Sequence, residues 1–276
     1  MTEKNSQGLR QVIYEKAMEF GADLVGIANV ADLKLSPSHE ISGKMTEYNG
    51  VGTRKEDGQN RRVVNWPDGF KSAIVIAVAH HIDKPEMDWW VTGNTSGNHQ
   101  LIRIVSKLAT WLEIEAGIKY FKLPYHIERG GVYLKDAAVL AGLGCIGKNN
   151  LFITPQYGPR LRLRAMLTDA ELPSVGVSEF DPCENCCAPC HTACPQNAFE
   201  KQIYFPAVYG QTKLPGRSGS YNRIDCNQEM IINEANFEEV QIENQEKVGK
   251  RVKYCRECEL ACPVGVAYYE KRDYGG

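Results

Sequence analysis

The cysteines are the residues of this chain whose spacing most directly suggests chemistry. Nine of the ten cysteines lie between positions 183 and 262, in two runs. The first run, C-E-N-C-C-A-P-C-H-T-A-C-P, contains Cys183, Cys186, Cys187, Cys190 and Cys194. The second consists of an isolated Cys226 and the segment C-R-E-C-E-L-A-C-P, with Cys255, Cys258 and Cys262. Four thiolates at such spacings can enclose an iron–sulfur core, so we expect this part of the chain to bind iron–sulfur clusters.

The proline after the last cysteine of each run indicates how the runs share their ligands. In a C-x2-C-x2-C-x3-C-P run of a two-cluster ferredoxin, the cysteine before the proline binds the other cluster. Cys194-Pro195 and Cys262-Pro263 are the corresponding pairs here. We therefore predict two [4Fe-4S] clusters. Cluster I takes Cys183, Cys186 or Cys187, Cys190 and Cys262, and cluster II takes Cys194, Cys226, Cys255 and Cys258.

The first run has one residue more than the usual spacing, so either Cys186 or Cys187 is spare. Cys186 keeps the opening Cys-x-x-Cys turn intact and is favoured for that reason. Disulfides are the less favoured use of dense cysteines in a chain without a secretory segment. Structural zinc could use Cys-x-x-Cys pairs, but the gap of three residues before each Cys-Pro pair recurs in both runs. The tenth cysteine, Cys145, is expected to be a small buried thiol.

The overall composition limits the classes of partner. The net charge is −2 over 276 residues, and no basic block predicts a broad nucleic-acid surface. The N-terminal segment has neither an apolar signal-type region nor a twin arginine, and no run of eighteen apolar residues occurs. These features predict a cytoplasmic protein that does not bind membranes.

Hydrophobic periodicity predicts the elements that must position the cysteines. Predicted helices cover 8–20, 99–116, 134–141 and 227–250, and predicted strands cover 23–30, 71–80, 151–155 and 160–169. The continuous β-branched run at 71–80 is typical of a strand buried on both faces. Alternation in R-L-R-L-R places Arg160, Arg162 and Arg164 on one face of their strand. We expect residues 36–62 to form a long surface excursion.

A glycine-rich segment, A-G-L-G-C-I-G-K-N-N at 141–150, matches two nucleotide-binding patterns. Gly142, Gly144 and Gly147 fit G-x-G-x-x-G, and Gly142 to Lys148 fits G-x-x-x-x-G-K. Both patterns require a strand before the glycines and a helix after them. Here the predicted order is reversed, which argues against a dinucleotide or ATP. Two interpretations remain: a close backbone approach to a large ligand, with Lys148 and Asn149 as polar contacts, or a tight helix-to-strand turn.

Several segments together resemble a known family. They are P-D-G-F-K-S-A-I-V-I-A-V-A (67–79), A-G-L-G-C-I-G-K-N-N-L-F-I-T-P-Q-Y-G-P-R (141–160), L-T-D (167–169) and both cysteine runs. The chain is similar in these segments to epoxyqueuosine reductases and, more distantly, to corrinoid reductive dehalogenases. The resemblance implies an α+β protein with a nitroreductase-like α/β domain that binds cobalamin, followed by a ferredoxin-like domain with two [4Fe-4S] clusters. A change of composition near 171–181 sets the predicted domains at 1–175 and 176–276.

The resemblance also implies roles for individual residues. Counting back from Gly144 aligns Glu128 with the proton-donating aspartate of the family, and Tyr133 is a second candidate acid. Lys135 and Asp136 are further candidates by their location beside the glycine segment. The predicted cofactor contacts are Gly142, Gly144, Gly147, Lys148, Asn149 and Arg160.

Three functions remain in view at this point. The first is a cobalamin-dependent reductase of an unknown small substrate, supplied by an external donor such as ferredoxin or flavodoxin. The second is an electron-transfer protein that reduces the corrinoid of a partner, and the third is a reductase that binds FMN. The helical repeats with which the queuosine enzymes hold tRNA have no counterpart here, so tRNA is not expected as a partner.

Overall fold

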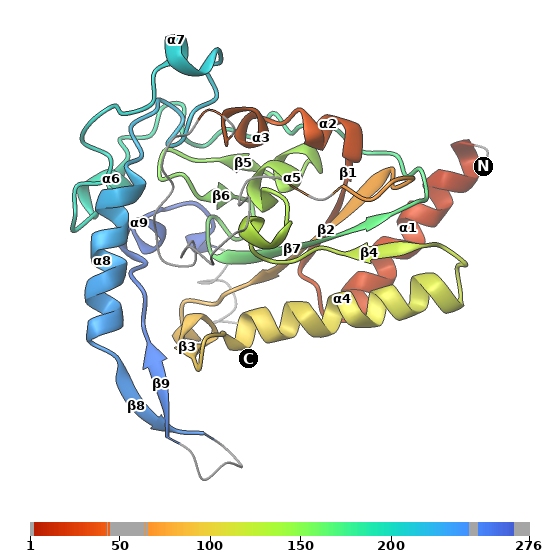
Figure 1. Cartoon of the computed structure of the whole chain (residues 1–276), viewed down its shortest axis with the longest axis horizontal. Helices are drawn as coiled ribbons and strands as arrows, with labels where there is room; N and C mark the ends of the chain where they lie inside the picture. Colours follow the sequence, from red (N-terminus) through yellow and green to blue (C-terminus); the bar gives the residue numbers. More distant parts are fainter. Residues whose placement is uncertain (1–2, 43, 45–63, 65, 243–247, 268–276) are drawn as a thin grey trace.

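The computed structural model describes residues 3–42, 44, 64, 66–242 and 248–267. A four-stranded antiparallel sheet with strand order β1-β2-β7-β4 forms the centre of this part of the chain (Figure 1). Its strands are β1 (Leu24–Asn29), β2 (Ser72–Ala79), β7 (Leu161–Thr168) and β4 (Tyr120–Lys122). All eight residues of β2 are buried, as the apolar run at 71–80 predicted.

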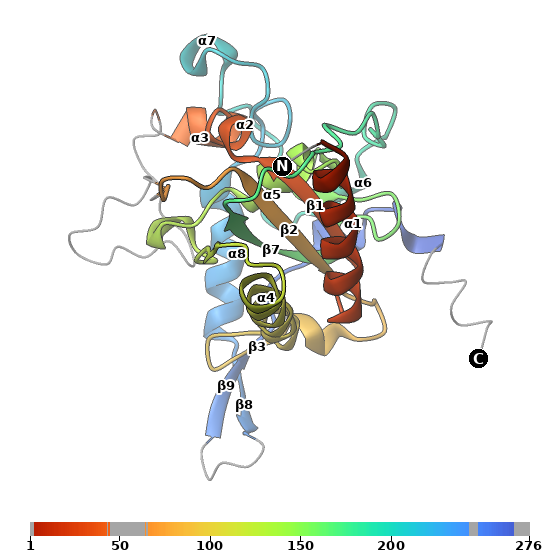
Figure 2. The same cartoon turned by 90° about the vertical axis from the view of Figure 1, so that its right-hand side faces the viewer.

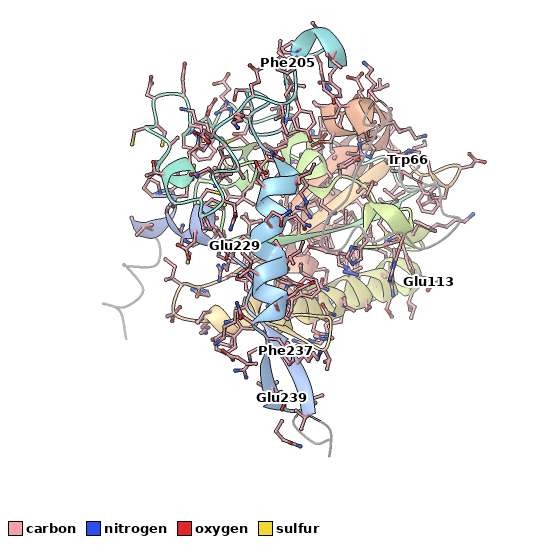
Figure 3. The ribbon with its side chains drawn as sticks, turned by 60° about the vertical axis from the view of Figure 1, so that its left-hand side comes forward. Trp66, Glu113, Phe205, Glu229, Phe237 and Glu239 are labelled. Carbon is pink, nitrogen blue, oxygen red and sulfur yellow. The ribbon has the colours of Figure 1, made fainter. Side chains whose placement is uncertain are left out.

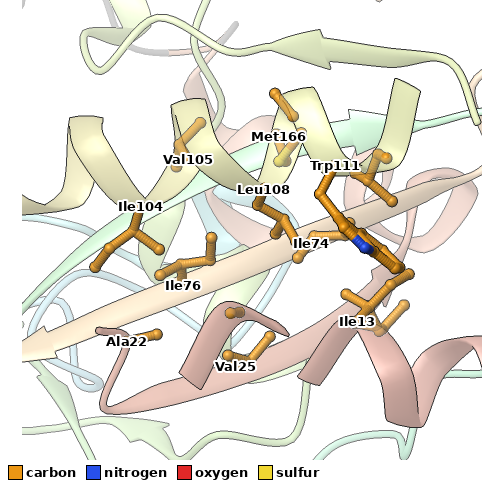
Figure 4. Packing of buried hydrophobic residues seen from close by; sticks show 14 of the residues in the cluster. Ile13, Ala22, Val25, Ile74, Ile76, Ile104, Val105, Leu108, Trp111 and Met166 are labelled. Atoms are coloured by element: carbon orange, nitrogen blue, oxygen red, sulfur yellow. The ribbon is translucent and has the colours of Figure 1, made fainter. Parts of the chain in front are cut away.

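Helices cover both faces of the sheet (Figure 2). On one face, α1 (Glu3–Glu19) and α4 (Ser96–Ile114) pack against each other and the sheet, and Leu108 contributes to a core with Ile13, Ile74 and Met166 (Figure 4). On the other face lie α2 (Val30–Lys34) and α5 (Leu134–Leu140). Successive side chains of a strand point to opposite faces of the sheet. Because β2 is buried at every position, it contributes to the core on both faces.

Short elements connect this layer to the rest of the chain. They are α3 (Pro37–Ser42), the 3-10 helices η1 (Pro85–Asp88) and η2 (Ile127–Arg129), and the two-stranded sheet of β5 (Cys145–Ile146) and β6 (Phe152–Ile153). The predicted excursion at 36–62 contains α3, and its residues 43 and 45–62 lie outside the described part of the chain.

The cysteine-rich part lies at one end of the central sheet (Figure 1). Its elements are α6 (Pro189–Thr192), α7 (Pro206–Tyr209), α8 (Arg223–Ala235), the hairpin β8 (Glu238–Gln241) and β9 (Val248–Val252), and α9 (Glu257–Leu260). Helix α8 begins below the loops that carry Phe205 and runs past Glu229 down to Phe237 and then Glu239 of the hairpin (Figure 3). Strand β9 also pairs with β3 (Trp90–Val91), so the two predicted domains contribute to one sheet.

One predicted element is wrong. The helix expected over 227–250 ends at Ala235, and the hairpin β8–β9 follows it. Asn236 caps the helix, and E-V-Q-I at 239–242 then alternates between polar and apolar residues with a period of two, which favours a strand. The other predicted helices and strands are confirmed within a few residues. Among the described helices, none is both long and apolar enough to cross a bilayer.

Candidate iron–sulfur and cofactor site

Four cysteines from distant segments line one small cavity. They are Cys183, Cys186, Cys190 and Cys262, the set predicted for cluster I. Cys190 lies in α6, and Cys262 follows α9. Cys187 is exposed and is not part of this lining. The structure therefore brings Cys186, rather than Cys187, to the other three.

The electrostatics of this set fit a cationic centre. Burial raises the pKa of the Cys190 thiol to about 11, and the charges of Cys262, Cys183 and Cys186 raise it further. Thiolates that repel one another in this way need a positive core between them. The backbone N–H of Ala188 donates to Cys186 Sγ over 3.4 Å, a contact that stabilises a sulfur ligand in its charged form.

A second set, Cys194, Cys226, Cys255 and Cys258, lines a much larger cavity. Burial raises the pKa of the Cys258 thiol, and the charges of Cys226, Cys255, Glu259 and Cys194 add to that effect. The backbone N–H of Ala198 donates to Cys194 Sγ over 3.4 Å. In the described part of the chain, no three or more histidine, cysteine, aspartate or glutamate side chains are arranged so that they could hold a metal ion. The ligand roles of both sets remain predictions.

The larger cavity has a volume of about 850 Å³ and combines walls from both parts of the chain. Tyr133, Lys135 and Gly144 come from the α5 region, and the cluster II cysteines come from α8, α9 and the end of the first cysteine run. Burial lowers the pKa of Lys135 to about 8. Its ammonium donates to the carbonyl of Asn150 over 2.6 Å.

The structure describes the side chains of the candidate acids Tyr133 and Asp136, but not that of Glu128. Tyr133 lines the large cavity, and its ring meets that of His39 edge-on at 4.8 Å. Asp136 is buried and accepts hydrogen bonds from the backbone N–H and hydroxyl of Ser38, each over 2.7 Å. Glu128 lies in η2, but its side chain is outside the described part of the structure.

The polar residues expected to contact a cofactor instead contact the cysteine segments. Lys148 Nζ donates to the carbonyl of Cys186 over 2.8 Å, and Asn149 Nδ2 donates to the carbonyl of Cys258 over 3.2 Å. Arg160 is fully buried and donates to the carbonyl of Cys262 over 2.6 Å. Asn149 also lines the large cavity, whereas Lys148 and Arg160 do not.

The glycines of the 141–150 segment are required by packing within the chain. A Cβ atom on Gly144 would lie 2.0 Å from the carbonyl oxygen of Ile153, and one on Gly147 would lie 2.3 Å from the Ile153 side chain. Gly142 has φ +74° and would meet Val175 at 2.4 Å. These approaches favour the tight helix-to-strand turn over a ligand-binding loop, although Gly144 does line the large cavity.

Sequence reasoning missed a buried ionic group beside the segment that carries Cys255 and Cys258. Asp88 accepts from His80 Nδ1 over 2.5 Å and pairs with Arg162 over 2.8 Å and with Arg256 over 2.6 Å. Burial alone would raise the pKa of Asp88, but the hydrogen bond from His80 and the charges of all three partners outweigh it and bring the pKa to about 2. The surrounding P-E-M-D segment contains no motif that would have identified Asp88.

Comparisons with known proteins support the resemblance. No family model matches the chain. An epoxyqueuosine reductase of Prochlorococcus marinus is 25% identical over 268 residues, which cover 94% of this chain and 79% of the relative. A second, of Gloeobacter violaceus, is 28% identical over 73% of this chain and 63% of its own length. A tetrachloroethene reductive dehalogenase of Desulfitobacterium hafniense is 42% identical over 67 residues, or 24% of this chain and 12% of the relative.

Solved structures have the same fold. An epoxyqueuosine reductase bound to an epoxyqueuosine-modified tRNA stem loop aligns with a TM-score of 0.57 at 20% identity, over 94% of this chain and 65% of its own. A reductive dehalogenase whose structure suggests a mechanism for B12-dependent dehalogenation aligns with a TM-score of 0.59 at 16% identity, over 97% of this chain and 34% of its own. The chain thus spans about two thirds or less of the solved proteins it matches.

These comparisons confirm the resemblance to epoxyqueuosine reductases and reductive dehalogenases, and they indicate a reductase enzyme. They correct one expectation. The exclusion of tRNA as a partner is wrong, because tRNA is bound by an epoxyqueuosine reductase with the same fold. The exclusion was inferred from helical repeats that have no counterpart in this sequence. That inference is unsound, because the part of the enzyme that does align with this chain has the same fold.

Proposed function

We propose that this chain is a cobalamin-dependent reductase that receives electrons through two [4Fe-4S] clusters. One observation carries the proposal: the cluster II cysteines line the same cavity of about 850 Å³ as Tyr133 and Gly144 of the α/β part. A cofactor in that cavity would have an electron source in its wall. We retain the predicted domains at 1–175 and 176–276, with nitroreductase-like and ferredoxin-like architectures, as part of this proposal.

The cavity suits a large organic cofactor. Its volume lies in the upper part of the range of about 300–1,000 Å³ that is typical of small-molecule sites. Its lining mixes apolar residues such as Val139 and Leu140 with polar ones such as Lys135 and Asn149. When bound, cobalamin supplies a strongly reducing cobalt centre that accepts electrons singly.

The residues of this chain then have distinct tasks. Cys183, Cys186, Cys190 and Cys262 hold cluster I, which accepts electrons from an external ferredoxin or flavodoxin. Cys194, Cys226, Cys255 and Cys258 hold cluster II at the cavity. Glu128 or Tyr133 supplies a proton to the reduced substrate. Tyr133 is supported by its position in the cavity wall, and Glu128 by its alignment with the acid of the related enzymes.

The substrate class follows from the related proteins only as a proposal. One group of relatives is named for epoxyqueuosine and the other for tetrachloroethene. We propose an electrophilic substrate that is cleaved by reduction, and both an epoxyqueuosine-containing tRNA stem loop and tetrachloroethene belong in the first assays.

Cofactor binding tests the proposal directly. Protein purified without oxygen is titrated separately with cobalamin and with FMN, while absorbance and the EPR signal of cobalt are recorded. We expect saturable binding of cobalamin with its lower base displaced from cobalt. Retention of FMN instead would support a flavin reductase, and binding of neither cofactor by protein with reducible clusters would support an electron-transfer protein. Either result would contradict the proposal.

A further inference from the structure

We propose that Arg160 is a positioning residue for cluster I. It fastens the segment that carries Cys262 to the central sheet, and it places a buried positive charge beside the cluster, which raises the cluster's reduction potential. This inference rests on the proposed function only in requiring that cluster I forms.

Three hydrogen bonds of Arg160 are directed at one segment. Its guanidinium donates to the carbonyls of Cys262 over 2.6 Å, Val264 over 2.8 Å and Leu260 over 3.3 Å. These three carbonyls lie between the end of α9 and the residues after Cys262. The planar fork of an arginine can bind several acceptors in a fixed geometry, so it fixes the path of the chain at the ligand.

The backbone before Arg160 packs against the same segment. A Cβ atom on Gly158 would lie 2.0 Å from the carbonyl oxygen of Val264, and one on Gly265 would lie 2.4 Å from the backbone nitrogen of Gly158. Both glycines have positive φ, +59° and +81°. The turn that precedes β7 and the bend after Cys262 are therefore in direct backbone contact, which positions Cys262 relative to the sheet.

The burial of Arg160 leaves its charge little screened by water. Its residue exposure is 0%, and water screens a buried charge much less than an exposed one. A four-thiolate [4Fe-4S] cluster is an anion, and the shortest hydrogen bond of the guanidinium is to the carbonyl of Cys262, a predicted ligand of cluster I. The reduction potential of such clusters depends on net charge and solvent exposure, so this cation should favour the reduced form.

Lys148, which lines the small cavity of the cluster I cysteines, gives a useful contrast. Its ammonium donates to the carbonyl of Cys186 over 2.8 Å, but Lys148 is only partly buried. Water screens a partly exposed charge more strongly than a buried one. We therefore assign the larger effect on the potential to Arg160.

The test separates charge from position with three variants. Arg160→Gln removes the charge, Arg160→Lys keeps it, and Gly158→Ala pushes the Val264 segment away while keeping Arg160. Arg164→Gln is the matched control, because Arg164 lies nearby in β7 but contacts Asn98 over 3.3 Å instead of the Cys262 segment. Midpoint potentials are measured by EPR-monitored redox titration, together with iron content, and Cys190→Ser identifies the signal of cluster I.

We expect the cluster I potential to shift to a more negative value in Arg160→Gln and to remain near the wild-type value in Arg160→Lys and Arg164→Gln. Selective loss of cluster I in Arg160→Gln would support the positioning role. Gly158→Ala should lose up to half of the iron, all of it from cluster I. A folded Arg160→Gln with full iron and an unchanged potential overturns the inference. If Arg160→Gln does not fold, full iron in Gly158→Ala overturns it instead.

These outcomes are separate from those that decide the proposed function. Two clusters without cobalamin binding contradict the function and leave the inference intact. Two clusters and cobalamin binding, with Arg160→Gln indistinguishable from wild type, contradict only the inference. Wild-type protein without cluster I contradicts both.

Discussion

At the scale of single residues, adjacent thiols have opposite environments. Cys186 lines the small cavity with three other cysteines, whereas the neighbouring Cys187 is exposed. The sequence reduced the choice to these two, because the first run has one residue too many, and it favoured Cys186 only through the intact Cys-x-x-Cys spacing. The direction of each side chain depends on the local backbone, which spacing alone does not specify.

We predict that Cys186→Ser loses cluster I and that Cys187→Ser keeps both clusters. A serine oxygen is a much poorer ligand for iron than a thiolate. Iron and acid-labile sulfide per chain distinguish the two: about half of the wild-type content for Cys186→Ser and full content for Cys187→Ser. The reverse pattern would assign the ligand to Cys187.

We also predict that Glu128→Gln slows turnover by ~10²- to 10⁴-fold while leaving both clusters and cobalamin binding intact, because a positioned acid contributes about that much. Tyr133→Phe is the matched comparison, since Tyr133 lines the cavity. The measurement is single-turnover reduction of substrate under anaerobic conditions. Undiminished turnover in Glu128→Gln would remove it as the proton donor.

At the scale of elements, the pattern of apolar residues predicted the helices and strands that form the core. The buried strand β2 was recognisable by its continuous apolar run. Helix α4 was recognisable because its apolar residues recur with a period of 3.6. The roles of Lys148 and Arg160 were not recognisable. Their partners, Cys186 and Cys262, lie 38 and 102 positions away in the sequence, and no local pattern encodes such contacts.

The glycine-rich segment yields a prediction at this scale. Gly144→Ala should lower the free energy of unfolding by about 1–3 kcal/mol, the usual range for an overpacked core, because its Cβ would lie 2.0 Å from the carbonyl of Ile153. Gly8→Ala is the control. Gly8 lies in α1 with nothing within 4 Å of its Cβ position, so the added methyl should stabilise the helix by about 0.5–1 kcal/mol. Urea unfolding measures both, and equal stability of the two variants would contradict the packing argument.

At the scale of the whole molecule, buried charges connect the sheet to the cysteine-rich part. Asp88 in η1 pairs with Arg162 of β7 and with Arg256, which lies between Cys255 and Cys258. Separating the two parts would break both of these buried ion pairs at once, so this group resists the separation.

We predict that Asp88→Asn lowers the free energy of unfolding by about 3–5 kcal/mol at neutral pH. The pKa of Asp88 is lowered from 3.8 to about 2, so its contribution is complete above about pH 4 and is lost as the pH falls through about 2. The difference from wild type should therefore shrink as the pH falls from about 4 towards about 2. Asp83→Asn, at an exposed site on the same segment, should be within about 0.5 kcal/mol of wild type. A difference that stayed constant over this acidic range would point to another group.

The central claim is that eight thiolates form two cages, each taking one ligand from the other's sequence run. The most direct test is the iron and acid-labile sulfide content of protein purified without oxygen, measured for wild type and for Cys262→Ser. We expect about eight iron and eight sulfide atoms per wild-type chain, and loss of cluster I, rather than cluster II, in the variant. Colourless wild-type protein without iron, or loss of cluster II on replacing Cys262, would contradict it.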